Sequence, residues 1–254
     1  MTVLAMDTST LVMGVAVLNE DRLLGEVLTN QKKNHSVRLM PTVERLLAEL
    51  DVTMRDLRLI AVGMGPGSYT GVRIGVTTAK MMAWALDVPL VGVSTLLTMA
   101  AGLGPVDGWI CPLIDARRGR VYAGLYRYEG DAVRLVRSET VTAWNDWLDD
   151  VLAPLEGPVW LGGEDAPIYQ EITLAALGER LRLPAPEHRL PRPSQLGRLA
   201  LQWYGGMIPT ENFPDPVVVA VEGDDVHRFA PRYLQKTLAE QKLAQRTGGG
   251  SGRG

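Results

Sequence analysis

The same order of secondary-structure elements is predicted twice along this chain of 254 residues, and this duplication restricts the possible folds more than any other feature. Short runs of β-branched residues between turn residues predict strands, whereas apolar residues at helical spacing predict helices. In each half the predicted order is β-β-β-α-β-α-β-α, although the halves share no residue-level repeat. We therefore expect an α/β protein with two similar halves built around mixed sheets.

The predicted elements divide the chain into an N-terminal half over residues 1–105, a C-terminal half over residues 106–225, and a C-terminal helix with a flexible tail over residues 226–254. The closing glycine-rich run is typical of a linker. The predicted helices cover residues 39–50, 72–86, 95–101, 143–152, 166–177, 194–204 and 233–245. The predicted strands cover residues 3–6, 13–18, 23–28, 59–62, 89–93, 109–114, 120–128, 132–136, 159–161, 181–183 and 217–221.

The charge of the chain argues against a nucleic-acid-binding platform. Lys and Arg number 26 against 29 Asp and Glu, and the densest basic cluster is Arg117, Arg118 and Arg120. Proteins that neutralise many phosphates usually gather more basic residues. We therefore expect contact with RNA to need a partner protein, and whether these three arginines touch RNA stays open.

Features of membrane and secreted proteins are also missing from the sequence. No apolar run reaches the 18 residues of a membrane span, and the N-terminus has no basic region followed by an apolar run and a small-residue cleavage site. The single cysteine, Cys111, excludes an internal disulfide framework. We expect no membrane association and a cytoplasmic location.

A glycine-rich turn from Gly63 to Gly71 follows a short buried strand and precedes a predicted helix. It is either a tight connection or a phosphate cradle, because backbone N–H groups at the start of a helix attract anions. The spacing matches neither standard phosphate motif: Val72 stands where a Walker loop needs Lys, and Ser68 stands at the last glycine of the dinucleotide fingerprint. The glycine spacing of a nucleophile elbow is also absent around Ser68. Gly67 and Ser68 remain weak candidates for phosphate binding.

Two aspartates end corresponding strands in the two halves. Asp7 precedes the hydroxyl residues Thr8, Ser9 and Thr10, and Asp115 precedes two arginines. Actin-like and sugar-kinase-like folds place a metal- or phosphate-contacting loop at the position of Asp7, so Asp7 and Thr8 are weak nucleotide candidates. The alternative for Asp7 is a residue that only forms a turn, and the alternative for Asp115 is a salt-bridged corner.

The helix predicted after the glycine-rich turn has small residues at every fourth position, which places them on one face. Two of them are glycines, which cost helix propensity, so close packing against that face should offset the cost. Such a face packs either against the helix at 39–50 in the same chain or against another protein. The residues of this ridge are Gly71, Gly75, Ala79 and Ala83.

The sequence predicts neither a catalytic residue nor a metal site. Its three histidines lie far apart, and a helical metal site at His35 would need a second histidine at position 39, which is Leu39. A lone His at the start of a helix more often serves as a capping or hydrogen-bonding residue.

Several segments together resemble the bacterial TsaB (YeaZ) family, whose members are accessory subunits in the formation of threonylcarbamoyladenosine in tRNA. The matching segments span nearly half of the chain, and the glycine-rich run is the most specific of them. These segments are Met6–Thr10, Asn34–Ser36 with Leu39–Pro41, Gly65–Gly75, Gly92–Leu96, and Ile114–Arg118 with Val121 and Tyr122.

The resemblance implies an actin/hexokinase-like fold of two ribonuclease-H-like halves, in agreement with the duplicated element order. It also implies a non-catalytic subunit that binds its catalytic TsaD-type paralogue through the two N-terminal helices. A small P-loop ATPase of the TsaE type is expected to join this pair. ATP and a metal ion are expected on the paralogue, and no cofactor is expected on this chain. The residues expected at the interface are Leu39, Val43, Leu46, Gly71, Gly75, Ala79 and Ala83.

The leading hypothesis is therefore a scaffold that activates the paralogue for transfer of threonylcarbamoyl to the adenosine beside the anticodon of tRNAs reading ANN codons. The tRNA would be contacted only indirectly, and the chain could form a homodimer when alone. The alternative is an enzyme of the same superfamily, either a cryptic ATPase using Asp7 and Asp115 or a metallopeptidase.

Overall fold

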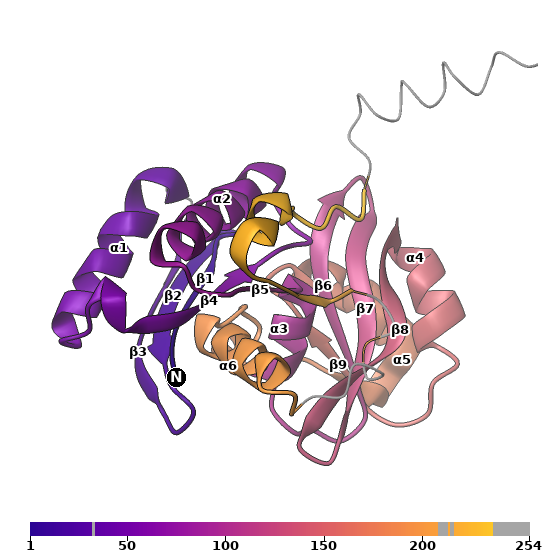
Figure 1. Cartoon of the computed structure of the whole chain (residues 1–254). Coiled ribbons are helices and arrows are strands. Elements are labelled where there is room, and N and C mark those ends of the chain that lie inside the picture. The colour runs from indigo at the N-terminus through magenta and orange to yellow at the C-terminus, as the bar shows by residue number, and fades with distance from the viewer. Residues whose placement is uncertain (32–33, 208–212, 214–215, 236–254) are drawn as a thin grey trace, which may run out of the picture.

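Two β-sheets with the same strand arrangement form the framework of the molecule (Figure 1). The computed structural model describes residues 1–31, 34–207, 213 and 216–235. In each sheet three antiparallel strands continue into two parallel ones, in the order β3-β2-β1-β4-β5 and β8-β7-β6-β9-β10. This confirms the predicted fold class, an actin/hexokinase-like fold of two α/β halves with mixed sheets.

Most strands lie close to the predicted positions, but the strand predicted over residues 132–136 continues to residue 143. The first sheet also contains a sixth strand, which pairs antiparallel with β5. The strands of the first sheet are β1 (Thr2–Asp7), β2 (Val12–Leu18), β3 (Leu23–Asn30), β4 (Leu57–Gly63), β5 (Leu90–Val93) and β11 (Val218–Val221). Those of the second sheet are β6 (Trp109–Arg117), β7 (Arg120–Glu129), β8 (Ala132–Ala143), β9 (Val159–Gly162) and β10 (Leu181–Arg182).

The helices cover both faces of each sheet. Within the described residues, no helix is long and apolar enough to cross a membrane. The α-helices are α1 (His35–Glu49), α2 (Tyr69–Leu86), α3 (Thr95–Gly102), α4 (Trp144–Trp147), α5 (Gln170–Leu177) and α6 (Pro193–Tyr204). Two of the predicted helices are irregular: α4 continues as the π-helical turn η2 (Leu148–Leu152), and α5 follows the 3₁₀ turn η3 (Ala166–Tyr169).

Alternating side chains of β1 supply two separate apolar cores. Leu4 and Met6 face outward into a core shared with α1 and α2, while Val3 and Ala5 face the space between the two sheets. This alternation follows from the two-residue period of a strand, and the fully buried strand needs apolar residues on both faces. A third core lies between the second sheet and the helices α4 and α5.

The helices α3 and α6 fill the space between the two sheets, and each packs against the sheet of the other half. α3, which follows β5, packs against β6, β7 and β8, whereas α6, which follows β10, packs against β1 and β2 (Figure 1). The sequence places α6 in the second half of the chain, but its packing surface is the first sheet. This exchange joins both halves into one continuous core.

The last strand also returns to the first sheet, because β11 pairs with β5 at its edge. The division into residues 1–105, 106–225 and 226–254 stays a prediction, and within 106–225 both α6 and β11 lie on the first sheet. Of the helix predicted over residues 233–245, the described residues 233–235 are not helical, and the rest, with the tail beyond it, lies outside the described residues.

The ridge of small residues on α2 faces this chain's own first sheet. A Cβ at Gly71 would lie 2.1 Å from the carbonyl oxygen of Thr8, and one at Gly75 would lie 2.7 Å from the Thr8 hydroxyl oxygen. Ala79 and Ala83 continue the same buried face. The ridge therefore allows α2 to approach the end of β1, which neither of the two alternatives considered from sequence anticipated.

The expected interface residues lie on these same buried faces, and whether they also contact a partner stays a prediction. All seven are buried within this chain: those of α1 pack in the outer core of the first sheet, and those of α2 lie beneath that helix. Helical periodicity identified the apolar faces, but those faces are used for folding. The residues concerned are Leu39, Val43, Leu46, Gly71, Gly75, Ala79 and Ala83.

Replacing Gly71 by Ala should lower the free energy of unfolding. Ala normally stabilises a helix by about 0.8–1 kcal/mol relative to Gly, but a Cβ here meets backbone, and overpacking costs about 1–3 kcal/mol. Gly102→Ala in α3 is the matched control, because its Cβ would meet only an ordinary contact at 3.9 Å. Urea unfolding of both variants measures the difference, and equal stabilities would contradict the close approach.

Candidate functional site

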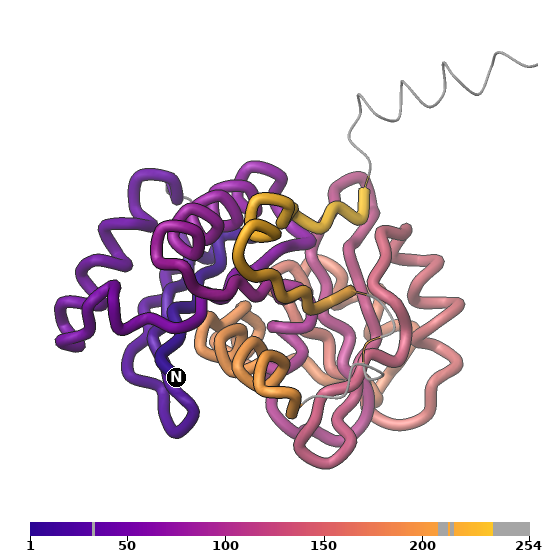
Figure 2. The backbone as a smooth tube through the Cα atoms, in the orientation of Figure 1, coloured from indigo at the N-terminus to yellow at the C-terminus, as the bar shows by residue number. Residues whose placement is uncertain are grey.

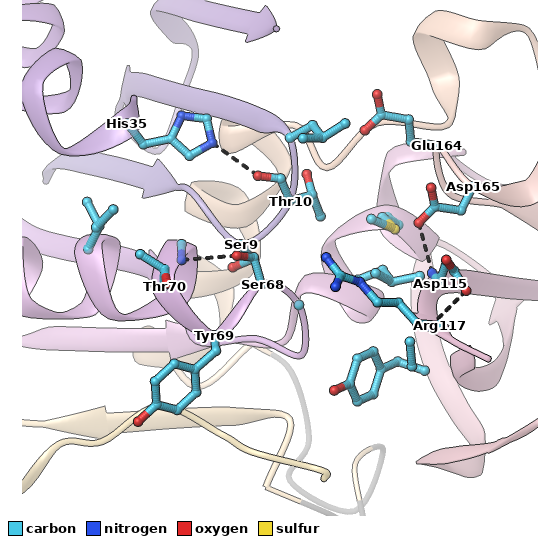
Figure 3. Close-up of a pocket in the computed structure, with 18 of the residues that line it drawn as sticks. Ser9, Thr10, His35, Ser68, Tyr69, Thr70, Asp115, Arg117, Glu164 and Asp165 are labelled. Carbon is cyan, nitrogen blue, oxygen red and sulfur yellow. Dashed lines mark hydrogen bonds between the residues drawn. The ribbon is translucent and has the colours of Figure 1, made fainter. Parts of the chain in front are cut away.

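A cleft of about 750 Å³ lies between the two halves and contains several of the predicted candidates. One wall is formed by the loop after β1, the start of α1 and the N-terminus of α2. The opposite wall is formed by the end of β6 and the turn after β9. Figure 3 shows Ser9, Ser68 and His35 on one side and Asp115, Glu164 and Asp165 on the other.

The glycine-rich turn lines the cleft, but its backbone is already engaged. Ser68 is the N-cap of α2, and its hydroxyl oxygen accepts a hydrogen bond from the backbone N–H of Gly71. The backbone N–H of Ser68 donates to the carbonyl oxygen of Ser9 at 2.7 Å. A Cβ at Gly67 would lie 2.1 Å from the same carbonyl oxygen. The loop after β1 thus occupies part of the space where a phosphate would approach this turn.

Asp7 lies beneath this loop instead of lining the cleft. It is 1% exposed, and its Oδ1 accepts a hydrogen bond from the backbone N–H of Ser9 at 2.7 Å. Its Oδ2 has no partner among the described residues. Burial raises the pKa of Asp7 above its usual value, and the hydrogen bonds from Ser9 offset only part of this effect.

Thr8 is also buried and bound within the fold. Its hydroxyl donates to the carbonyl oxygen of Gly71 at 2.7 Å, which joins the loop after β1 to the first turn of α2. Of the four weak nucleotide candidates, Gly67 and Ser68 therefore line the cleft, whereas Asp7 and Thr8 support its wall.

Asp115, at the end of the first strand of the second half, faces the cleft. Its Oδ1 accepts hydrogen bonds from the Tyr169 hydroxyl at 2.8 Å and from the backbone N–H of Arg117 at 3.0 Å. The backbone N–H of Asp115 donates to Oδ2 of Asp165 at 2.8 Å. The Asp115 carboxylate is thus held by hydrogen bonds at this corner of the chain and lines the cleft.

Glu164 and Asp165 were not identified from the sequence, because they belong to an irregular turn after β9. Burial raises the pKa of both carboxyl groups; the neighbouring Asp165 raises the pKa of Glu164 further, and Asp115 raises that of Asp165. The polar run Gly-Gly-Glu-Asp directly after a predicted strand is the sequence signal that could have indicated them. This wall therefore gathers three carboxyl groups within a partly buried site.

His35 lines the opposite wall as a hydrogen-bonding residue. Its Nε2 lies 3.1 Å from the carbonyl oxygen of Thr10, and Asn34 caps the helix that it begins (Figure 3). Leu39, one turn later, is buried in the outer core. In the part of the chain that the structure describes, no three His, Cys, Asp or Glu side chains gather as a metal site would need.

Of the three clustered arginines, Arg117 lines the cleft and points into it (Figure 3). Arg118 is exposed in the tight turn between β6 and β7, where both arginines have positive φ. The guanidinium of Arg120 donates to the carbonyl oxygen of Val141 at 3.3 Å. The three arginines therefore have separate environments and do not form one basic surface.

Comparison with known families supports the resemblance found in the sequence, over much of the chain. The family model described as "TsaD: tRNA N6-adenosine threonylcarbamoyltransferase" matches residues 22–185. The tRNA threonylcarbamoyladenosine biosynthesis protein TsaB of Bacillus subtilis is 41% identical over 242 residues, covering 95% of this chain and 97% of that protein. The Escherichia coli protein of the same name is 30% identical, covering 96% and 98% of the two chains.

Solved structures agree with this match. A Pseudomonas aeruginosa protein described as similar to peptidase YeaZ aligns with a TM-score of 0.71 and 30% identity, covering 92% of this chain and 99% of its own. A structure described as YeaZ from the same organism aligns with a TM-score of 0.69 and 29% identity over the same shares.

Replacing Asp7 by Asn should raise the free energy of unfolding at pH 7. A carboxyl group with a raised pKa contributes most to stability below its unfolded pKa, and this contribution is lost as the pH rises through its folded pKa. The advantage of Asn should therefore shrink as the pH falls toward 4. Urea unfolding across this pH range measures it, and a loss of stability at pH 7 would instead indicate a favourably paired carboxylate.

Proposed function

The chain belongs to the TsaB (YeaZ) family, and from this premise we propose that it is a binding subunit in the formation of threonylcarbamoyladenosine in tRNA. It would bind a TsaD-type catalytic paralogue and stabilise its active arrangement for transfer of threonylcarbamoyl to the adenosine beside the anticodon of tRNAs that read ANN codons. Its contribution would be the free energy of the interface, with no bond chemistry of its own.

One observation carries this proposal: the outer face of α2 presents a stripe that is exposed except at the half-buried Ile74. The stripe repeats at intervals of three and four residues, which places its members on one side of the helix. Met81 and Trp84 are 58% and 55% exposed, which is unusual for side chains of their size. The members of this α2 stripe are Thr70, Ile74, Thr77, Met81 and Trp84.

A groove beside the α2 stripe supports the docking of another helix. It has a volume of about 500 Å³ and lies between the start of α1, at Ser36, and the outer face of α2. Ile74 and Thr77 belong both to the groove and to the stripe. An amphipathic helix could place apolar side chains in the groove while its backbone follows α2. The partner surface thus uses both N-terminal helices, through their outer residues.

The cleft supports a binding role more than an independent ATPase. The Ser9 carbonyl oxygen lies close against Gly67, and burial of Asp7, the carboxyl group considered for a metal- or phosphate-contacting role, raises its pKa. We propose that ATP and a metal ion bind to the catalytic paralogue and that this chain has no cofactor of its own.

The remaining partners follow from the same proposal. A small TsaE-type P-loop ATPase would join the complex, and tRNA would be contacted through the paralogue. Without its partner, the chain could form a homodimer through the exposed α2 stripe, because apolar helix faces of this size associate when uncovered. The complex would act in the cytoplasm.

Thr77→Arg should abolish co-purification with the TsaD-type paralogue. Thr77 lies in the middle of the α2 stripe and is exposed, so a long charged side chain there would be desolvated only upon binding. Gly75 is unsuitable for this test, because its Cβ would already meet Thr8 in the free chain. Affinity purification of the tagged chain with the paralogue gives the readout.

Ile172→Arg on α5 is the control for this variant. Ile172 is 42% exposed and lies in the other half, so its replacement should leave the complex intact. Both variants should keep the melting temperature of the wild-type chain within a few degrees, as surface substitutions usually do. Co-purification of Thr77→Arg at wild-type level would refute the assignment of this face.

Calorimetry of the isolated chain with ATP and magnesium tests the alternative enzyme function. The buried Asp7 and the engaged backbone of Ser68 lead us to expect no turnover and no tight binding. Turnover that is lost in Asp7→Asn, or in Asp115→Asn at the open wall of the cleft, would favour the ATPase over the binding subunit.

A further inference from the structure

The segment from Phe229 to Gln235, here called the clasp, runs from α2 to the strands of the second sheet. Figure 2 shows it as the yellow tube that passes beside the purple α2 and reaches the top of the pink strands. The clasp contacts both halves of the molecule along this path.

On the first half, the clasp is held by packing and by backbone hydrogen bonds. The ring of Phe229 fills the space above Gly92, where a Cβ would lie 2.3 Å from its Cζ. Lys80 of α2 donates to the carbonyl oxygen of Phe229 at 2.7 Å. The backbone N–H of Arg232 donates to the carbonyl oxygen of Met64 at 2.8 Å, at the start of the glycine-rich turn.

On the second half, the clasp is held by a buried ion pair. The guanidinium of Arg232 donates to Glu139 of β8, whose side chain is completely buried. Glu139 also accepts hydrogen bonds from the hydroxyl groups of Ser94 and Tyr126. Removing one partner of such a pair leaves the other charge buried without compensation, so Arg232 fixes the clasp firmly. Gln235 adds a contact, because Tyr122 donates to its side-chain oxygen at 3.3 Å.

At the surface, this anchoring places Tyr233 on the first turn of α2. The rings of Tyr233 and Tyr69 stack with their centroids 5.2 Å apart and an angle of 26° between their planes. The guanidinium of Arg73 lies 5.2 Å from the centre of the Tyr69 ring and donates to the Tyr69 hydroxyl at 2.6 Å. Both tyrosines remain about half exposed, at 49% and 47%.

We propose that Tyr69, Arg73 and Tyr233 form a platform that extends the partner-binding surface, and that Arg232 and Glu139 are positioning residues that hold it in place. This inference rests on the proposed function, because the platform is continuous with the α2 stripe at Thr70 and Ile74. Aromatic and arginine side chains of this kind dominate the energy of many interfaces.

The charge of the platform indicates what the paralogue presents to it. Arg73 is exposed and has no carboxylate partner in the described part of the chain. An acidic side chain on the paralogue would pair with this guanidinium while an apolar neighbour covers the tyrosine rings. The platform therefore fits an acidic end of the docking helix.

Tyr233→Ala should weaken binding of the paralogue about tenfold, as expected for an interface anchor. Isothermal titration calorimetry of the full chain with the paralogue gives the dissociation constant. Tyr233→Phe keeps the stacked ring and should bind within about twofold of the wild type. Ile168→Ala, at a position 66% exposed in the other half, should also leave the affinity unchanged.

Arg232→Met tests the positioning role through a double-mutant cycle. Because Arg232 acts through Tyr233, the double variant Arg232→Met/Tyr233→Ala should bind no more weakly than Tyr233→Ala alone. Hydrogen exchange should accelerate in residues 229–235 of Arg232→Met. Additive losses, or wild-type affinity of Tyr233→Ala, would overturn the inference, and the second outcome does not depend on whether Arg232→Met folds.

The test also separates this inference from the proposed function. If Thr77→Arg abolishes binding while Tyr233→Ala binds normally, the platform is wrong and the α2 surface stands. If neither variant affects binding, the partner surface lies elsewhere and both proposals fail. If Tyr233→Phe and Tyr233→Ala lose the same affinity for the paralogue, the stacked ring is not the cause of the loss, and the platform proposal is overturned.

Discussion

The close approach of α2 to the end of β1 is the contact on which the rest of the structure depends. Gly71 and Gly75 leave room for the backbone and hydroxyl of Thr8, and the Thr8 hydroxyl closes the contact with a hydrogen bond to the first turn of α2. The same approach brings the Ser9 carbonyl against the glycine-rich turn. One packing constraint thus narrows the cleft and also determines which face of α2 remains outside.

The two halves are held together by elements that cross between them. α3 and α6 each cover the sheet of the other half, and β11 closes the edge of the first sheet. The buried pair of Arg232 and Glu139 adds a polar connection at the surface side of this shared core. The exchanged helices therefore give the two halves a shared core instead of a simple contact between two separate bodies.

Local patterns predicted the elements of this fold well, whereas contacts between distant residues could not be read from one sequence. The strand and helix periods gave both sheets and the position of α2 within a few residues. The ridge of small residues was recognised from the sequence, but the residue that packs against it was not, because Thr8 lies 63 positions away from Gly71. The same limit applies to Arg232 and Glu139, separated by 93 positions. Glu164 and Asp165 escaped prediction because an irregular turn places them beside Asp115.

Helix α2 shows why apolar periodicity by itself does not identify an interface. Its inner face is small and buried, whereas its outer face carries larger side chains, including Met81 and Trp84, that remain exposed. A buried face contributes to folding, so substitutions there lower stability and binding together. Exposed side chains contribute less to folding, although Trp84 contacts the ring of His227, so substitutions at the exposed positions should change binding more than stability. The two faces of one helix therefore separate the residues that this chain needs to fold from those that we propose bind a partner.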